Sequence, residues 1–348
     1  MENTTQIIIN KEYSLSKEAK IVNINSNTPI GRMNISTLSQ IRRLSNLEKI
    51  KTIREFYSGI DVLNISGSQD YGRMLGSKQS RKYLNYISEV ISETLPMVTD
   101  YHTNIFPERK RCYQNLESVI LEDKVLETPV YNHSGVTGRT SIVKGFNFLT
   151  LKKDSRKKLK HKDKMLVEVD FKSCEPFFFL KSQGVEIPGS DVYSWLSEKY
   201  GIHELAREKV KRGILSLIYG ANTYTTSKIM RLDLKTVEMI KEDMGINDLE
   251  TRLREEYDKN GFILNYYNRP ITSDNNLVNY WIQSSAVDFC SLAFRQFCLE
   301  EDINPCFFIH DSMTFCVEEK RLKQVLNIDS IKEEVSGISI PIDFTVIN

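Results

Sequence analysis

Residues 165–175 read MLVEVDFKSCE, and this stretch decides the fold of the chain. Apolar and polar side chains alternate over 165–171, as they do along a β-strand that has one face against a core. A strand is therefore expected there, with Asp170 near its end. A helix is expected to begin at about Cys174, directly after the strand.

A second acidic residue follows a similar apolar run far along the chain. Residues 305–317, PCFFIHDSMTFCV, predict two short strands joined at His310 and Asp311, and residues 340–347, IPIDFTVI, predict a last strand. A single aspartate at a strand end is usually a turn or cap residue. If Asp170 and Asp311 lie on adjacent strands of one sheet, however, they form the carboxylate pair that holds Mg²⁺ in phosphoryl-transfer sites.

Helical patterns surround these strands. The sequence predicts a strong helix over 203–219 that ends at Gly220, and short extended pieces over 128–151. Further helices are expected over 35–54, 78–97, 174–200 with interruptions, 221–259 with a break at Gly245, and 277–299. Helices first, then strands mixed with helices, then strands indicate the α+β class with helical appendages.

Four residues of the 203–219 helix lie on one face because they are four apart: Arg207, Lys211, Leu215 and Tyr219. A stripe of two cations, an apolar residue and an aromatic residue suits a nucleoside triphosphate, with the cations at the phosphates and the ring near base and sugar. The alternative is an ordinary solvated basic face that ends in a tyrosine.

Composition narrows the class of protein. The chain has 348 residues, enough for about two domains, and its 40% hydrophobic and 27% charged content is that of a globular protein. The first ten residues lack a secretory signal, and the densest apolar stretch, 176–180, is too short to span a bilayer. We therefore expect a cytoplasmic protein with no membrane partner. The six cysteines show no C-x-x-C spacing and predict buried thiols in a reducing compartment.

Charge is balanced overall but not locally. The net charge is +1, whereas residues 139–164 hold ten Lys or Arg and two Asp. Such a basic stretch is either a solvated loop or a surface that faces phosphates.

Five segments, in this order along the chain, resemble the motifs of the DNA polymerase I family (family A). The segment TGRTS (137–141) is similar to T-G-R-L-S, and VDFKSCE (169–175) is similar to D-Y-S-Q-I-E. The pattern R-x₃-K-x₃-L-x₃-Y-G (207–220) is similar to the nucleotide-binding helix of the fingers. The segment NYWIQSSAVD (279–288) is similar to N-x-x-x-Q-G-T-A-A-D, and FIHDS (308–312) is similar to H-D-E. The resemblance implies a right-hand polymerase fold. The palm would be an antiparallel sheet from 126–200 and 276–348, the fingers 201–275, and the thumb part of a helical region over 1–125.

The resemblance also implies roles for residues. Asp170 and Asp311, with the backbone carbonyl of Phe171, would hold two Mg²⁺ ions, for which Mn²⁺ could substitute. Residues implied to bind the incoming nucleotide are Arg207, Lys211, Leu215, Tyr219 and Glu175, and Glu175 would also exclude a ribose 2′-OH. Residues implied to bind primer–template DNA are Arg139, Asn279, Gln283, His310, Lys152 and Lys153. The expected partners are primer–template DNA, dNTPs and a processivity or replication accessory protein.

Two departures keep alternatives open. Leu215 stands where the family usually has an aromatic residue, and Ser312 stands where it has Glu. Ser312 and the run VKRGILSLIYG (210–220) instead resemble the single-subunit phage RNA polymerases. The alternatives are therefore an RNA polymerase or primer-synthesising enzyme of the same superfamily, or a catalytically inactive DNA-binding relative. Glu175 favours DNA synthesis, because an RNA polymerase needs room there for the 2′-OH.

Absent motifs add to this. The chain has no G-x-x-x-x-G-K-[ST] phosphate-binding loop and no acidic exonuclease motif before residue 137, so we expect synthesis without proofreading. The Lys-, Ile- and Asn-rich composition fits a low-GC genome, and the compact, exonuclease-less arrangement suggests a phage or another mobile element as the origin.

Overall fold

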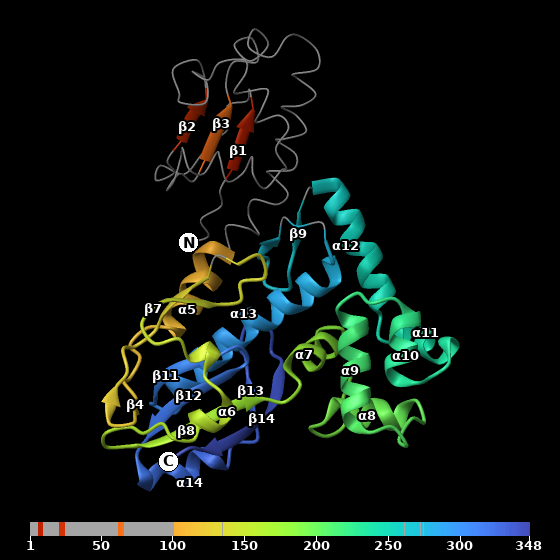
Figure 1. The fold of residues 1–348 in the computed structure, drawn as a ribbon. Helices are drawn as coiled ribbons and strands as arrows, with labels where there is room; N and C mark the ends of the chain where they lie inside the picture. Colours follow the sequence, from red (N-terminus) through yellow and green to blue (C-terminus); the bar gives the residue numbers. More distant parts are fainter. Residues whose placement is uncertain are drawn as a thin grey trace.

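The computed structural model describes the strands β1 (Gln6–Ile9), β2 (Ile21–Ile24) and β3 (Val62–Ile65), and residues 101–348 except 134, 261, 272 and 274. Within residues 101–348, an antiparallel sheet and its covering helices form one part, and a group of helices extends to one side (Figure 1).

The main sheet has five strands in the order β11-β12-β8-β14-β13, and every neighbouring pair is antiparallel. Their bounds are β11 (Asn304–Ile309), β12 (Ser312–Val317), β8 (Met165–Phe171), β14 (Ser339–Val346) and β13 (Ser330–Lys332). The central strand is β8, where the alternation of apolar and polar residues sends Val167 and Val169 into the core and leaves Asp170 on the opposite face. The sheet therefore presents Asp170 in its middle rather than at its edge.

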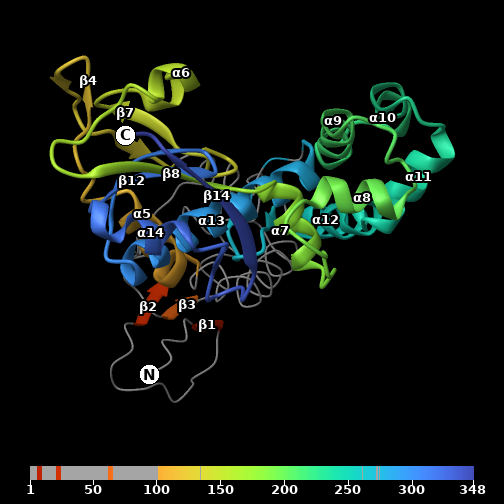
Figure 2. The same ribbon diagram turned by 90° about the horizontal axis from the view of Figure 1, so that it is seen from below.

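The apolar face of the sheet packs against α13 (Leu277–Glu300), α7 (Cys174–Ser182) and α5 (Phe106–Cys112) (Figure 2). Phe171 marks this contact, with its ring centroid 4.7 Å from that of Phe294 and 5.4 Å from that of Phe289. Because α13 is buried along most of its length, its residues are mainly apolar on nearly all sides of the helix.

The opposite face carries a smaller apolar cluster in which Phe148 stacks on Phe307 with 4.1 Å between ring centroids. The short elements of this part of the chain are β4 (Ile120–Leu121), β5 (Lys124–Val125), β6 (Val130–Asn132), β7 (Ser141–Lys144), the 3₁₀ turn η2 (Phe148–Thr150) and α6 (Lys153–Arg156). Arg156 of α6 donates to Glu168 of β8 at 2.6 Å and thereby ties α6 to the strand that carries Asp170.

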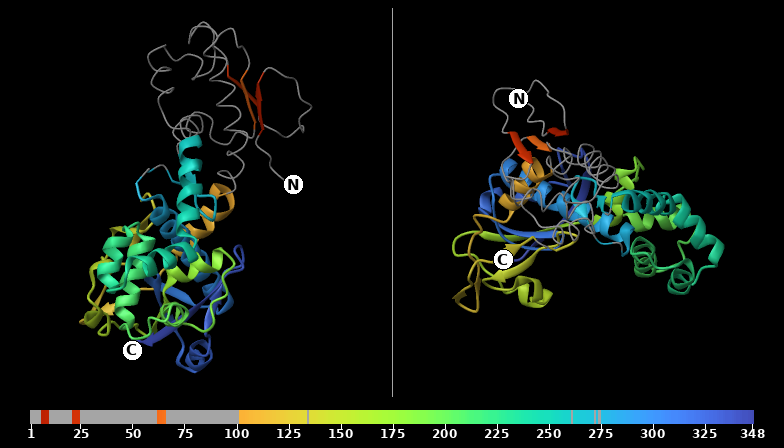
Figure 3. Two further views of the ribbon diagram at one scale, coloured as in Figure 1. Left: turned by 90° about the vertical axis from the view of Figure 1, so that its right-hand side faces the viewer. Right: turned by 90° about the horizontal axis from the view of Figure 1, so that it is seen from above.

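The lateral helices are α8 (Val192–Lys199), α9 (Arg207–Ile218), α10 (Thr223–Met230), α11 (Leu234–Asp243) and α12 (Ile246–Asn260) (Figure 3). In α9 the buried residues Val210, Ile214 and Leu217 face the core of this group, which leaves the stripe from Arg207 on another face. The remaining described elements are η1 (Tyr101–Ile105), the hairpin β9 (Ile263–Leu264) and β10 (Pro270–Ile271), and α14 (Glu319–Leu326).

The predicted α+β class is confirmed. The strand expected at 165–171 is β8, the expected helix at 277–299 is α13, and the strands meet at His310 and Asp311 as predicted. All six cysteines are buried and free. Among the described residues, no helix is both long and apolar enough to pass through a bilayer.

One prediction is wrong, and one region contains elements that were not expected. The helix expected from His203 begins only at Arg207, because Leu205 donates to the carbonyl of Ile202 in a turn and Ala206 is extended. The region expected to be helical over 1–125 contains β1, β2 and β3, which form a parallel sheet in the order β1-β3-β2, and also β4 and β5. Ile and Val dominate β1, β2 and β3, and such β-branched residues favour strands. The helices expected over 35–54 and 78–97 lie outside the described residues.

Candidate active site

The two aspartates expected to meet are brought together by strand register. Ser312, the first residue of β12, lies directly opposite Asp170 of β8, and Asp311 precedes it in the turn. The amide of Phe171 donates to the backbone carbonyl of Asp311 at 3.3 Å, which joins the end of β8 to this turn. His310 adopts a left-handed φ of 54° that lets β11 reverse direction within two residues.

The electrostatics of these carboxyl groups reflect that proximity. Asp170 is exposed to solvent in part, and neighbouring groups bury the rest of its carboxyl group. This burial, and then the negative charge of Asp311, raise the pKa of Asp170 to about 7. Burial likewise raises the pKa of Asp311. Two carboxyl groups that resist ionisation together are stabilised by a bound cation.

A cleft of about 470 Å³ lies over this end of the sheet. Asp170 and Asp311 form part of its wall, and α9 contributes Arg207, Lys211 and Leu215, together with Tyr219, which follows its last turn. The predicted residues Phe171, Glu175 and Arg139 also line it. Thus residues predicted from four separate motifs share one cavity.

Arg207 is held inside the cleft by an acid that the motifs do not include. Its Nε lies 2.8 Å from Oδ2 of Asp191 and its Nη2 lies 3.0 Å from Oδ1, while its guanidinium stacks 5.2 Å from the ring centroid of Tyr193. Asp191 also caps the N-terminus of α8. Burial alone would raise the pKa of Asp191, but the hydrogen bonds from Arg207, Ser194 and the Tyr193 amide lower the pKa to about 2.

Glu175 lies between the sheet and α9 and is held from two sides. Arg139 donates to its Oε1 at 3.0 Å, and the hydroxyl of Tyr219 donates to its Oε2 at 2.5 Å. Burial, and then this bond to Glu175, raise the pKa of Tyr219. Glu175, in the first turn of α7, therefore has one carboxylate oxygen held by Arg139 and the other held by Tyr219.

Other predicted residues lie outside the lining of the cleft. Asn279 and Gln283 are half-buried on α13, and His310 is exposed in the turn, where burial of part of its ring lowers its pKa. Lys152 and Lys153 are exposed at α6. Arg156 of α6 donates to Glu168, which lies on the same face of β8 as Asp170, so α6 lies on that face of the sheet.

Among the residues that line this cavity, sequence reasoning missed Asp343, Lys172, Asp191 and Tyr193. Asp343 on β14 lies directly opposite Asp170, on the flank away from Ser312, and its Oδ1 is 2.9 Å from Nζ of Lys172. The alternation in residues 340–347 indicated a strand, and a polar residue in its middle was the available signal for Asp343.

The donor set suits a hard divalent cation that is completed by substrate. Within the described part of the chain, no group of three or more His, Cys, Asp or Glu side chains is arranged to hold a metal ion. Mg²⁺, however, commonly binds through one or two carboxylates, with phosphate and water oxygens as the other ligands. Asp170, Asp311 and the carbonyl of Phe171 fit this kind of site.

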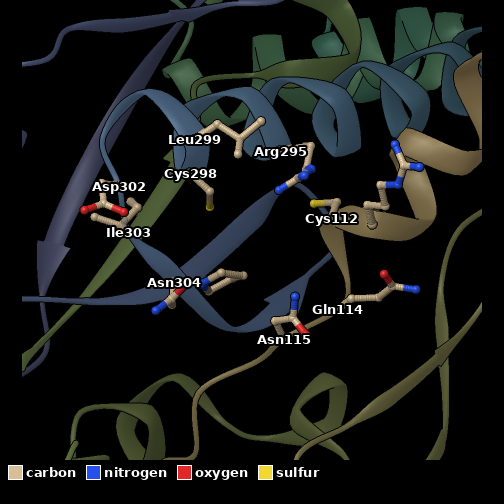
Figure 4. Close-up of a pocket in the computed structure, with 11 residues that line it drawn as sticks. Cys112, Gln114, Asn115, Arg295, Cys298, Leu299, Asp302, Ile303 and Asn304 are labelled. Carbon is tan, nitrogen blue, oxygen red and sulfur yellow. The ribbon is translucent and has the colours of Figure 1, made fainter.

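A second cavity of about 290 Å³ lies between the C-terminal parts of α5 and α13 and the strand β11 (Figure 4). Cys112, Arg295 and Asn304 are among its wall residues. None of the predicted site residues lines it, so this cavity is separate from the cleft that contains Asp170 and Asp311.

Comparison with known proteins finds similarity to solved structures and no match to a family model or a curated protein. One similar solved structure is the POL domain of Pol1 from M. smegmatis in complex with DNA primer-template and dNTP. It is 13% identical, with a TM-score of 0.44 over 77% of this chain and 52% of that one. The chain thus spans about half the length of that structure.

Proposed function

We propose that this protein is a template-directed DNA polymerase that extends a primer with dNTPs and lacks proofreading. One observation carries the proposal: a single cleft collects Asp170 and Asp311 at the sheet and Arg207, Lys211 and Tyr219 on α9. Acidic groups and cations at opposite walls of a cavity suit a triphosphate whose α-phosphate lies near the acids and whose outer phosphates lie near the cations.

The chain's own residues have separable tasks in this proposal. Lys211 and Arg207 bind the triphosphate and stabilise the negative charge that develops on the departing pyrophosphate. Arg207 must exchange Asp191 for phosphate oxygens, since both acceptors need the same guanidinium face. Tyr219 and Leu215 support base and sugar.

Asp170 and Asp311 would hold Mg²⁺, which supplies activation of the attacking primer hydroxyl and neutralisation of the triphosphate. The carboxylates orient the reacting groups around one point at the end of β8, on a rigid central strand. Mn²⁺ is the expected substitute, because it takes the same oxygen ligands.

Glu175 supports deoxynucleotide selection. Its carboxylate is held by Arg139 and Tyr219 rather than free to rotate away, so a ribose 2′-OH would meet a fixed obstacle. The exposed lysines at α6, Lys152 and Lys153, together with the neighbouring basic residues of 139–164, would bind duplex phosphates. An accessory protein that improves processivity is a further proposed partner.

Primer extension on a primed DNA template tests the proposal, with Mg²⁺ present and dNTPs or rNTPs offered separately. We expect extension with dNTPs, and its loss in Asp170→Asn and Asp311→Asn while binding to the primed template persists. A suitable control is Asp302→Asn, an exposed aspartate at the second cavity, which should retain extension. Full activity in the Asp170 and Asp311 variants would refute the site.

The second candidate is an RNA polymerase or primer-synthesising enzyme, which is favoured by Ser312 in place of a third carboxylate. Ser312 is buried, and its hydroxyl donates to the carbonyl of Ile309 at 3.0 Å, so it serves the turn. Preferred incorporation of rNTPs by the wild-type protein would select this candidate. Binding of primed DNA without incorporation of either nucleotide would select the inactive relative.

A further inference from the structure

A buried ion cluster lies outside the cleft, on the side of α13 that faces α5. Asp288 is fully buried, with its Oδ1 3.2 Å from Nε of Arg109 and 2.8 Å from Nη2 of Arg269. Its Oδ2 accepts from the side-chain amide of Asn265 at 2.8 Å. The hydroxyl of Tyr101 accepts from Nε of Arg269 at 2.8 Å. One carboxylate thus orders two arginines from different parts of the chain.

Arg109 depends strongly on this carboxylate. Its side chain is fully buried, and among the described residues it contacts the carboxylate of Asp288 and the backbone carbonyl of Gly138. Its Nε and Nη1 have no hydrogen-bond partner within the described part of the chain, so Asp288 acts on Arg109 as a counter-charge rather than as a hydrogen-bond acceptor. Because a buried guanidinium is strongly destabilised without a counter-charge, Asp288 determines where Arg109 can lie.

The guanidinium groups of both arginines lie against the backbone of Gly138. Nη2 of Arg109 donates to the Gly138 carbonyl, and a Cβ built on Gly138 would lie 1.5 Å from Nη1 of Arg269. Gly138 also has a φ of 71° and donates its amide to the carbonyl of Gly135 at 2.7 Å. The backbone therefore lies so close to both guanidinium groups that only glycine fits there.

The residue after Gly138 is Arg139, which donates to Glu175 in the cleft. We propose that Asp288 is a positioning residue for nucleotide selection: through Arg109 and Arg269 it fixes the backbone at Gly138, and so directs Arg139 onto Glu175. The selection part rests on the proposed function, whereas the positioning of the loop does not.

Amide hydrogen exchange of the full-length protein tests the positioning. In Asp288→Asn, which keeps the shape and removes the charge, we expect exchange in 135–141 to accelerate by about tenfold, with exchange in 246–258 of α12 unchanged. Unchanged exchange in the loop, or equal acceleration in both segments, would overturn the proposal. Should Asp288→Asn not fold, Tyr101→Phe removes only the hydroxyl that holds Arg269, and the same selective acceleration is expected to a smaller extent.

A double-mutant cycle tests the link to selection. We expect Asp288→Asn to lower the ratio of dNTP to rNTP incorporation efficiency about fivefold, and to have no further effect on this ratio when Arg139 is already Ala. A fall of equal size in both backgrounds would show a general structural effect and overturn the proposal, as would no fall in either. If the wild-type protein extends no primer, the proposed function fails, and hydrogen exchange alone decides whether Asp288 positions the loop.

Discussion

Arg207 and Asp191 form a bidentate ion pair at the N-terminus of α9, with 2.8 Å between Nε and Oδ2 and 3.0 Å between Nη2 and Oδ1. The pair joins the N-terminus of α8 to the first residue of α9. It occupies the guanidinium that the proposed function needs for the triphosphate. If Arg207 binds the triphosphate as proposed, nucleotide binding and this ion pair compete.

The competition predicts the effect of Asp191→Asn. Asparagine still caps α8 but holds Arg207 less strongly, so we expect the KM for dNTP to fall about threefold with little change in kcat. Steady-state primer extension measures both constants. The matched control is Asp233→Asn, which changes the equivalent cap of α11, where no arginine of the described residues forms an ion pair with the carboxylate. A rise in KM would mean that Asp191 orients Arg207 instead of competing for it.

The raised pKa of Asp170 predicts how the metal-free protein responds to pH. Burial and Asp311 raise this pKa to about 7, so the native state keeps a proton that the unfolded chain releases near pH 4. The stability that this group contributes is complete below about pH 4 and is lost as the pH rises through about 7. We expect the Tm of the wild type, relative to that of Asp170→Asn, to fall between about pH 5 and about pH 8.

Differential scanning calorimetry with a chelator measures these Tm values. A difference that stays constant across the pH range would contradict the assignment. Mg²⁺ should raise the Tm of the wild type more at about pH 8 than at about pH 5, because the ionised carboxylate binds it.

The hydroxyl of Tyr219 is expected to contribute to nucleotide selection through Glu175. Tyr219→Phe keeps the ring but leaves Glu175 with Arg139 as its remaining partner, so the ratio of dNTP to rNTP incorporation should fall about threefold. Glu175→Ala should lower the ratio further. The control is Tyr224→Phe, whose exposed ring lies under Lys228 and outside the cleft lining. An unchanged ratio in Tyr219→Phe would separate Tyr219 from selection.

Close packing of α9 on α10 predicts the cost of a methyl group at Gly213. A Cβ there would lie 2.2 Å from both Cγ and Sδ of the fully buried Met230. Gly213→Ala should lower the free energy of unfolding by about 1–3 kcal/mol through overpacking. Arg212→Ala, on the exposed face of α9, should stay within about 0.5 kcal/mol.

Denaturant unfolding measures both variants. Adding Met230→Val to Gly213→Ala should recover part of the loss, because the shorter side chain makes room for the new methyl group. Equal destabilisation by Gly213→Ala and Arg212→Ala would argue against the tight contact.

Salt dependence tests the role of the lysines at α6. If Lys152 and Lys153 each neutralise a DNA phosphate, the double alanine variant should reduce the slope of log K against log salt by about 1.8, at about 0.9 per phosphate. Fluorescence anisotropy with a labelled duplex measures the slope. Lys320→Ala with Lys323→Ala on α14 is the control, since these exposed lysines lie away from the cleft lining. A slope equal to that of the wild type would remove α6 from the DNA surface.

Local patterns in the sequence were sufficient for the elements that carry the cleft. Alternation of apolar and polar residues located β8, because one face of the strand is buried. A long, mainly apolar run located α13, because that helix is buried on nearly all sides. The four-residue spacing from Arg207 to Tyr219 placed those side chains on one face of the helix. The start of α9 was missed, since the extended backbone at Ala206 has no marker in the sequence.

Residues whose partners lie far along the chain were decided by the tertiary structure alone. Asp343 lies opposite Asp170 because β14 pairs with β8 in one register, and a shift of one residue would turn Asp343 to the other face. Asp191 lies beside Arg207, and Asp288 lies beside Arg109 and Arg269, because tertiary packing brings these segments together. The order of the segments in the sequence does not indicate these distances. The sequence by itself thus determined which segments are strands and helices and which residues are chemically suited to a site. Only the three-dimensional pairing decided which acid faces which base, because electrostatic and hydrogen-bond energies depend on separation in space.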